Sequence, residues 1–200
     1  METLNKTYHH KNLRPALLDE AAIMITEGGV ESVTMRALGQ RLGVSRAAPY
    51  RHFKDKSDLM LSVAATGFEK LEKRIQPTLS ESSLTIEEKL QGLGEVYIQF
   101  AQENPAHYRL MYGNEALNRR TRPTLKDSGD TLFALLRKVI GAFQEETGTT
   151  HKDTWILAYV AWSAVHGLAS LLIEEQILFE VNVEALIHQT MCTVVDGIKS

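Results

Sequence analysis

The sequence is poor in cysteine and lacks the patterns that mark several classes of enzyme and metal protein. Its one cysteine, Cys192, excludes a disulfide framework within the chain, and a reducing compartment is therefore expected. No His-Glu-x-x-His spacing, Gly-rich phosphate loop or Gly-x-Ser-x-Gly turn occurs. Ser163 and His166 would share a helical face, but no third partner orients them. We therefore expect no catalysis, no metal site and no cofactor.

Signals for export and membrane insertion are also scarce. No basic and apolar leader opens the chain, so a cytoplasmic location is expected. The segment from Trp155 to Ile173 carries no formal charge over nineteen residues, which is long enough for a membrane span. It is the only such segment, it contains Ser163, His166 and Ser170, and its flanks show no charge bias. We expect instead a helix buried all round, between its own core and a partner subunit.

Alternating strand patterns and internal repeats are absent, whereas apolar residues recur at helical spacing along most of the chain. The sequence therefore predicts an all-α fold. Gly28-Gly29 should stop the first helix, Thr34, Asp55 and Asn182 should cap later ones, and Thr85 and Glu88 should form a capping box. The expected helices start near residues 13, 34, 45, 55, 85, 105, 125, 155 and 182, and the helix from Asp55 should end at Pro77.

The stretch from Thr34 to Phe53 has the pattern of two short helices joined by a tight turn. Gly43 supplies the positive φ that ends the first helix, and Ser45 can cap the second. The second helix would present basic and small side chains to a duplex groove, with further polar residues where the DNA backbone passes. These are Arg46, Ala47 and Ala48, followed by Tyr50, Arg51, His52 and Lys56. The alternative is an ordinary helical corner with a solvated basic face.

Charge is distributed unevenly along the chain, although its net value is only −3. Residues 1–56 hold nine Lys and Arg against six Asp and Glu, a balance of +3, which leaves thirteen against nineteen, or −6, for residues 57–200. A basic unit attached to an acidic one fits a DNA-reading domain joined to a domain that does not bind DNA. We therefore divide the chain into a DNA-binding domain at 1–56 and a ligand-binding and dimerisation domain at 57–200.

The same stretch resembles the N-terminal pattern of the tetracycline-repressor-like (TetR) transcriptional regulators. The shared features are Thr34, the apolar pair Leu38 and Leu42, Gly43-Val44-Ser45, Tyr50-Arg51-His52-Phe53 and Lys56 with Leu59. The resemblance implies an all-helical homodimer whose three-helix heads bind a palindromic operator in double-stranded DNA. It also implies a larger domain that takes up a small-molecule effector and releases the DNA, the usual behaviour of a repressor.

Carried over by position, the resemblance assigns Arg46, Ala47 and Ala48 to the bases and Thr34, Tyr50, His52 and Lys56 to the phosphates. Two departures stand out. Gly39 replaces the Ala more usual in the first helix of the motif, which costs up to about 1 kcal/mol of helix propensity. Pro49 lies in the first turns of the second helix, where it removes a backbone donor.

Aromatic residues gather on one face of the uncharged helix. Trp155, Tyr159, Trp162 and His166 would form a pocket wall for a flat or partly hydrophobic ligand, and neighbouring helices offer Tyr97, Phe100, Tyr108 and Met111. The alternative is that these residues pack in the core or in a dimer interface. Trp162-x-x-x-His166-Gly167 also resembles the signature of one C-terminal subgroup of these regulators, which does not identify a ligand.

The last helix carries a wide apolar stripe from Val183 to Ile198. Together with the uncharged helix it is the expected homodimer interface, a four-helix arrangement when doubled. Recognition of a palindrome requires this two-fold symmetry. The sequence therefore predicts a ligand-responsive, DNA-binding regulator; the alternative is a helical ligand-binding module without specific DNA binding.

Overall fold

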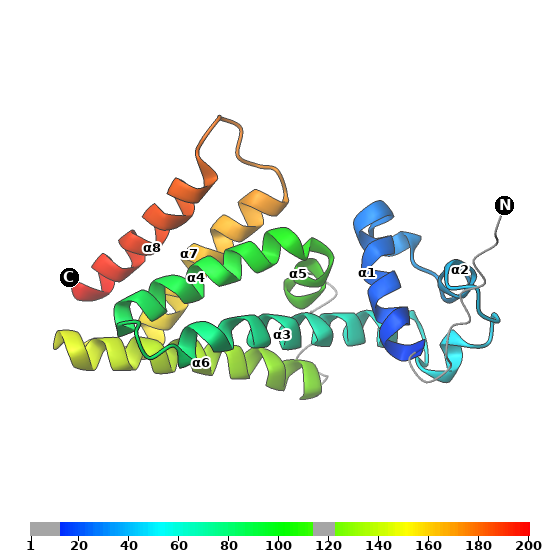
Figure 1. The fold of residues 1–200 in the computed structure, drawn as a ribbon, viewed down its shortest axis with the longest axis horizontal. Coiled ribbons are helices and arrows are strands. Elements are labelled where there is room, and N and C mark those ends of the chain that lie inside the picture. Colours follow the sequence, from blue (N-terminus) through cyan, green and yellow to red (C-terminus); the bar gives the residue numbers. More distant parts are fainter. Residues whose placement is uncertain (1–12, 114–122) are drawn as a thin grey trace.

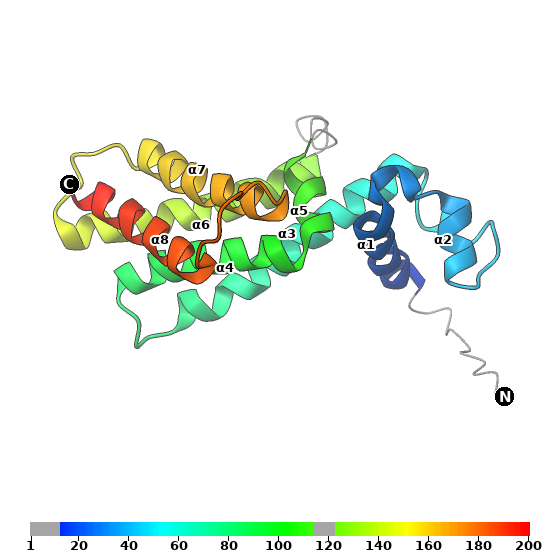
Figure 2. The same cartoon turned by 90° about the horizontal axis from the view of Figure 1, so that it is seen from above.

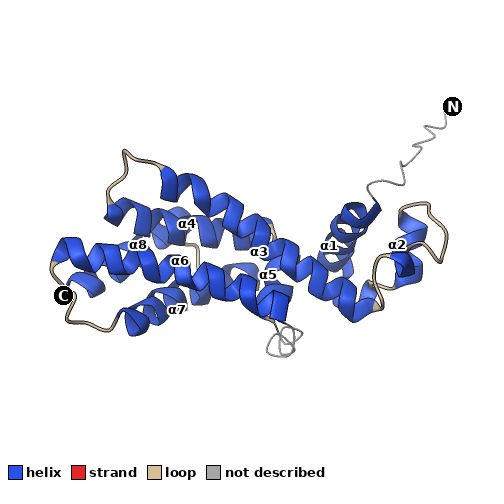
Figure 3. Cartoon of the chain, turned by 90° about the horizontal axis from the view of Figure 1, so that it is seen from below, coloured by secondary structure: helices blue, strands red, loops and turns tan. Residues whose placement is uncertain are grey.

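The structure is a computed structural model that describes residues 13–113 and 123–200. Within these ranges the chain forms helices joined by short connections and contains no strand, which confirms the predicted all-α fold (Figure 3). The elements are α1 (Leu13–Ser32), α2 (Met35–Arg41), the short 3-10 helix η2 (Pro49–Arg51), α3 (Lys56–Ser80), α4 (Ile86–Glu103), α5 (Pro105–Tyr112), α6 (Pro123–Thr147), α7 (Thr154–Ile173) and α8 (Val183–Lys199).

The molecule is elongated, with a small head at one end and a larger helical body at the other (Figure 1). The head contains α1, α2 and η2, and the body contains α4, α6, α7 and α8. The long helix α3 runs from the head along the body, and α5 lies beside it and also contacts α1 (Figure 2). Phe53 is 1% exposed and anchors the head, as its apolar side chain after the turn predicts.

Helix starts follow the predicted caps. The side chains of Thr34, Asp55 and Asn182 accept hydrogen bonds from the backbone N–H groups of Ala37, Asp58 and Ala185 at 3.1, 2.8 and 2.9 Å. The Thr85 hydroxyl and the Glu88 carboxylate form the reciprocal capping box. These bonds satisfy backbone donors that helices leave free at their first turns.

Helix ends agree with the predictions except at Gly28-Gly29 and Pro77. Gly43 and Gly148 follow the ends of α2 and α6 with φ of 66° and 73°, values that favour glycine and stop helices. Gly28 and Gly29 have non-helical φ and ψ, but they form a kink inside α1, which continues to Ser32. The prediction that α3 ends at Pro77 is wrong, because the helix continues to Ser80. A proline so close to the end removes one backbone donor, and the final turn is completed by the Glu81 N–H, which donates to the Pro77 carbonyl at 3.0 Å.

The uncharged helix α7 is buried on one side within the protomer, and burial of its other side by a partner subunit stays a prediction. Its inner side packs against α4, α6 and α8 through a row of small and aliphatic residues. Its outer side exposes Ile156, Val160 and Leu171. Among the described helices, α7 alone is long and apolar enough to cross a membrane, a test that core helices also pass.

Candidate DNA-binding surface and ligand cavity

The turn between α2 and η2 is tightly held. The Val44 N–H donates to the Gly39 carbonyl at 2.9 Å, and Gly39 is buried beneath the Pro49 ring and the Ser45 carbonyl. Arg41 fastens α2 to α1 through ion pairs of 2.5 Å with Glu20 and Glu27. The following segment is therefore presented on a fixed support.

The predicted second helix beginning at Ser45 is less regular than expected. Ser45 to Ala48 forms a hydrogen-bonded turn, with the Ala48 N–H donating to the Ser45 carbonyl at 2.9 Å, and one turn of 3-10 helix follows at Pro49–Arg51. Because Pro49 has no N–H, the segment lacks one of the donors that a continuous α-helix would use.

Most of the predicted DNA-contacting residues lie on the surface of this segment. The exposed ones are Thr34, Ser45, Arg46, Ala47, Tyr50, Arg51 and His52. Tyr50 is 58% exposed, so its ring and hydroxyl are open to a partner. An arginine, a small residue and an aromatic hydroxyl are thus all exposed on this segment, as contact with base edges and phosphates requires.

Two predicted contacts differ from the others. Ala48 is only 9% exposed and packs in the hydrophobic core, so its assignment to the bases needs correction: its side chain supports the turn from within. Lys56 is half-buried, and its Nζ lies 3.3 Å from the carboxylate of Glu31. A phosphate would have to compete with Glu31 for this ammonium group, and the Glu31 side chain is 97% exposed, so the competition is weak.

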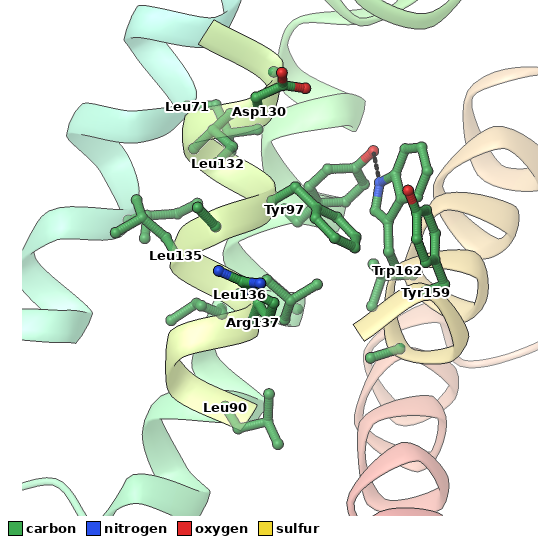
Figure 4. Close-up of a pocket in the computed structure, with 18 of the residues that line it drawn as sticks. Leu71, Leu90, Tyr97, Asp130, Leu132, Leu135, Leu136, Arg137, Tyr159 and Trp162 are labelled. Carbon is green, nitrogen blue, oxygen red and sulfur yellow. Dashed lines mark hydrogen bonds between the residues drawn. The ribbon is translucent and has the colours of Figure 1, made fainter. Parts of the chain in front are cut away.

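The body contains a partly open cavity of about 550 Å³ between α3, α4, α5, α6, α7 and α8 (Figure 4). Its volume lies within the range typical of small-molecule sites. Part of the lining is aliphatic, with Leu71, Ile75, Leu90 and Met191, and α7 contributes the aromatic residues Trp155, Tyr159 and Trp162. The arrangement suits a ligand with a large apolar surface.

Four of the eight predicted wall residues line this cavity, namely Tyr97, Trp155, Tyr159 and Trp162. The other four do not. Phe100, Tyr108 and Met111 are at most 2% exposed and belong to the packed core. His166 lies behind the wall, where its ring centroid is 5.3 Å from that of Trp162.

The residues that α6 contributes to the cavity were not predicted from the sequence. Phe133 is the centre of the aromatic group: its ring centroid lies 4.6 Å from Tyr159, 5.9 Å from Trp155 and 6.2 Å from Trp162. Asp130 and Arg137 also line the cavity, as does Tyr112 of α5. The apolar periodicity of this helix shows that one face is buried, but not which helix it meets.

A buried polar cluster adjoins the cavity. The hydroxyls of Tyr97 and Tyr108 lie 2.9 and 2.6 Å from Nδ1 of His166, and the Trp162 indole N–H donates to the Tyr97 oxygen at 3.4 Å. Burial raises the pKa of both tyrosines, which keeps their hydroxyls protonated. The cluster joins α4, α5 and α7 at the cavity wall.

His107 links α5 to the head. It is 5% exposed, and its Nε2 lies 3.4 Å from the Lys70 Nζ of α3, which in turn lies 3.7 Å from the carboxylate of Asp19 in α1. Burial, followed by the positive charge of Lys70, lowers the pKa of His107 to about 4. The imidazole is therefore neutral at physiological pH.

Comparisons with known proteins agree with both regions. The family described as bacterial regulatory proteins, tetR family, matches residues 17–63, and the family described as tetracyclin repressor-like, C-terminal domain, matches residues 90–194. The chain is 30% identical over 132 residues to the nucleoid occlusion factor SlmA of Vibrio vulnificus. The matched region covers 64% of this chain and 67% of that protein.

Solved structures share the whole fold. A protein of unknown function from Rhodococcus sp. RHA1 superimposes with a TM-score of 0.86 at 26% identity, covering 98% of this chain and 100% of that chain. The TetR family transcriptional regulator PfmR of Thermus thermophilus gives a TM-score of 0.71 at 20% identity, covering 90% and 97%. At that identity the likeness shows the fold alone.

The two family matches divide between the head and the body as the sequence motifs do. The match to the C-terminal domain alone spans 105 of the 200 residues, and the match to the N-terminal domain contains the helix-turn-helix motif from Thr34 to Phe53. The subgroup suggested by Trp162, His166 and Gly167 stays a prediction. The chain belongs to the TetR family of transcriptional regulators.

Proposed function

We propose that this protein is a homodimeric repressor that binds a palindromic operator and releases it when a small molecule enters the cavity of the body. The observation that carries the proposal is the combination of an outward basic surface in the head with a largely apolar cavity in the body of the same chain. We take residues 1–56 as the DNA-binding domain and residues 57–200 as the ligand-binding and dimerisation domain.

The proposed operator contacts are exposed residues of the turn and η2, together with Thr34 at the start of α2 and the half-buried Lys56 at the start of α3. Arg46 would read a base edge, with Ala47 allowing close approach, and Ser45 would support the start of this segment. Thr34, Tyr50, Arg51, His52 and Lys56 would hold phosphates. Ala48 is left out of this set because it is buried.

The proposed dimer interface is the outer side of α7 together with α8. Ile156, Val160 and Leu171 are 62%, 57% and 43% exposed, and they follow one another on a single helical side. Large apolar residues grouped in this way mark interaction surfaces. A second copy related by a two-fold axis would cover them and place two heads on the two halves of a palindrome.

Helix α5 connects the cavity to the head. Its Tyr112 lines the cavity, its Tyr108 hydroxyl reaches His166 of α7, and its Arg109 pairs with Glu174 at the end of α7 at 2.8 Å. The same helix packs against α1 and α3. A ligand that moves the α7 side of the cavity would therefore change the packing of α5 on the head, which is the physical link that allostery requires.

The test is selection of bound duplexes from a random-sequence pool by the purified protein, followed by affinity measurements at several salt concentrations. We expect a palindromic consensus and a steep fall of affinity with salt, because phosphate contacts release counterions. Absence of enrichment, with weak binding to every sequence, would contradict the proposed operator recognition.

A further inference from the structure

The lining of the cavity is largely apolar, but it includes two charged residues of α6. These are Asp130 and Arg137, and the other described residues that line the cavity are uncharged. A charged group beside a largely apolar cavity is a strong determinant of which ligand fits, since burying a charge without a partner is unfavourable. The two side chains therefore bear on the chemical class of the effector.

Arg137 is held in place by an aromatic ring. Its guanidinium carbon lies 4.1 Å from the centroid of the Trp155 ring, and the side chain is half-buried. A guanidinium over an aromatic ring can keep the N–H donors at its edge available, which suits a planar oxyanion. Among the described residues no carboxylate lies within ion-pair distance of Arg137.

Asp130 is exposed to solvent and lies seven residues before Arg137 on the same helix. At about 1.5 Å of rise per residue the two positions are roughly 10 Å apart along α6. In Figure 4 Asp130 lies at one end of the group of lining residues, whereas Arg137 lies further along α6. The carboxylate of Asp130 is therefore hydrated and distant, and Arg137 is the charge that a bound ligand would meet within the aromatic wall.

We propose that the effector is an amphipathic anion, an inference that rests on the effector site proposed above. Its apolar body would occupy the space between the aliphatic floor near Leu90 and the aromatic wall of Phe133 and Trp162. Its oxyanion, such as a carboxylate, would accept hydrogen bonds from the edge of the Arg137 guanidinium. The charge-assisted bidentate contact would orient the ligand, and the apolar contacts would supply most of its affinity.

The test compares two fluorescent probes that differ in one group, anilinonaphthalene sulfonate and the uncharged N-phenylnaphthylamine. Trp155 and Trp162 are the only tryptophans of the chain and both line the cavity, so energy transfer from tryptophan reports a probe bound near this part of α7, and its dependence on Arg137 assigns the probe to the cavity. We expect the sulfonate probe to bind more tightly. Replacing Arg137 should weaken the sulfonate probe by about tenfold or more and change the neutral probe by less than about twofold.

Arg137→Met keeps most of the length of the side chain over Trp155 and removes its charge. Lys138→Met is the matched control, since it removes the neighbouring positive charge from an exposed position of α6 that does not line the cavity. Asp130→Asn is a second test of the electrostatic potential at the cavity, because it removes a negative charge. Asp130 is exposed, so the substitution should leave the packing unaltered and strengthen binding of the sulfonate probe at low salt.

Tighter binding of the neutral probe, or equal effects of Arg137→Met on both probes, would overturn the inference and leave the cavity as an uncharged ligand site. Absence of energy transfer from tryptophan to either probe in the wild-type protein would overturn the inference together with the proposed effector site. Operator binding by the same preparations is measured in parallel. Absence of operator binding would contradict the proposed DNA recognition without contradicting the inference about the effector.

Discussion

His107 is a buried histidine whose titration should be visible in the stability of the protein. Its pKa is about 4 in the folded chain against 6.5 for an ordinary histidine, so the unfolded chain binds more protons between these values. The contribution of His107 to the free energy of unfolding is therefore largest above about pH 6.5 and is lost as the pH falls toward 4. We expect a loss of about 2 kcal/mol between about pH 7 and pH 5.

The measurement is urea unfolding at both pH values. His107→Asn should be less stable at neutral pH because it perturbs a packed site, but its stability should change less with pH. His151→Asn is the matched control, since His151 is exposed in the connection between α6 and α7. An unchanged pH dependence in His107→Asn would assign the acid sensitivity to another group.

Arg46 and Lys56 should contribute to DNA binding in different ways. Arg46 is exposed on the turn, where it can meet a base edge, so Arg46→Ala should cost about 1–3 kcal/mol of discrimination at one base position. Lys56 lies at the start of α3, so Lys56→Ala should weaken binding to all sequences alike and lower the salt slope by about 1. Affinities for single-base variants of the selected operator measure both effects. Equal losses on every sequence from both substitutions would refute this division.

Single residues were predictable from sequence where their roles depend on near neighbours. The caps Thr34, Asp55 and Asn182 each bond to a backbone group three residues away, and the positive φ of Gly43 is needed by the turn that contains it. The burial of Ala48 depends on tertiary packing around an irregular turn, and no periodicity indicates which side of such a turn is covered.

At the scale of elements, the outer side of α7 should control dimerisation. Val160 is 57% exposed in the protomer, and Val160→Glu would place a charge in the proposed interface. We expect sedimentation to shift toward the monomer while the helix content is retained, and operator affinity to fall with it. Gln76→Glu, an exposed position on α3, is the control. A dimer that persists unchanged in Val160→Glu would place the interface elsewhere.

Helix α5 should transmit the state of the cavity to the head. Tyr108→Phe removes the hydroxyl that reaches His166 and leaves the ring in place. We expect operator binding and binding of anilinonaphthalene sulfonate to persist when each is measured alone, with a smaller effect of the probe on operator affinity. Coupling of this kind typically amounts to about 5–150-fold. An undiminished effect of the probe would show that α5 does not carry the coupling.

The elements themselves were largely predictable, but their partners were not. The apolar spacing of α6 identified a helix with one buried face, yet the contacts of Phe133 with Trp155 and Tyr159 join residues more than twenty positions apart in the chain. Likewise, Phe100 and Met111 have the residue types of a pocket wall, and only the packing of α4 and α5 shows that they are core residues. Which side of a helix meets a cavity is a property of the assembled bundle.

At the scale of the whole molecule, the two heads of the proposed dimer would require matching spacing in the DNA. Heads of a symmetric dimer bind half-sites whose centres are one helical turn apart, about 34–36 Å, or a multiple of it. Inserting about five base pairs between the half-sites of the selected operator rotates one of them to the opposite side of the duplex. We expect this insertion to abolish tight binding, and an insertion of about ten base pairs to be tolerated better. Equal affinity for both would indicate independent heads.

The apolar outer side of α7 should make the stability of the protein depend on its concentration in the cell. If the subunit is stabilised by covering Ile156 and Val160 with a second copy, its resistance to heat depends on its own concentration, because association draws the folded state out of the unfolding equilibrium. Dilution would then lower the melting temperature and the supply of paired heads together. A repressor built in this way is sensitive to its own abundance: when few copies are present, the operator is freed without any effector.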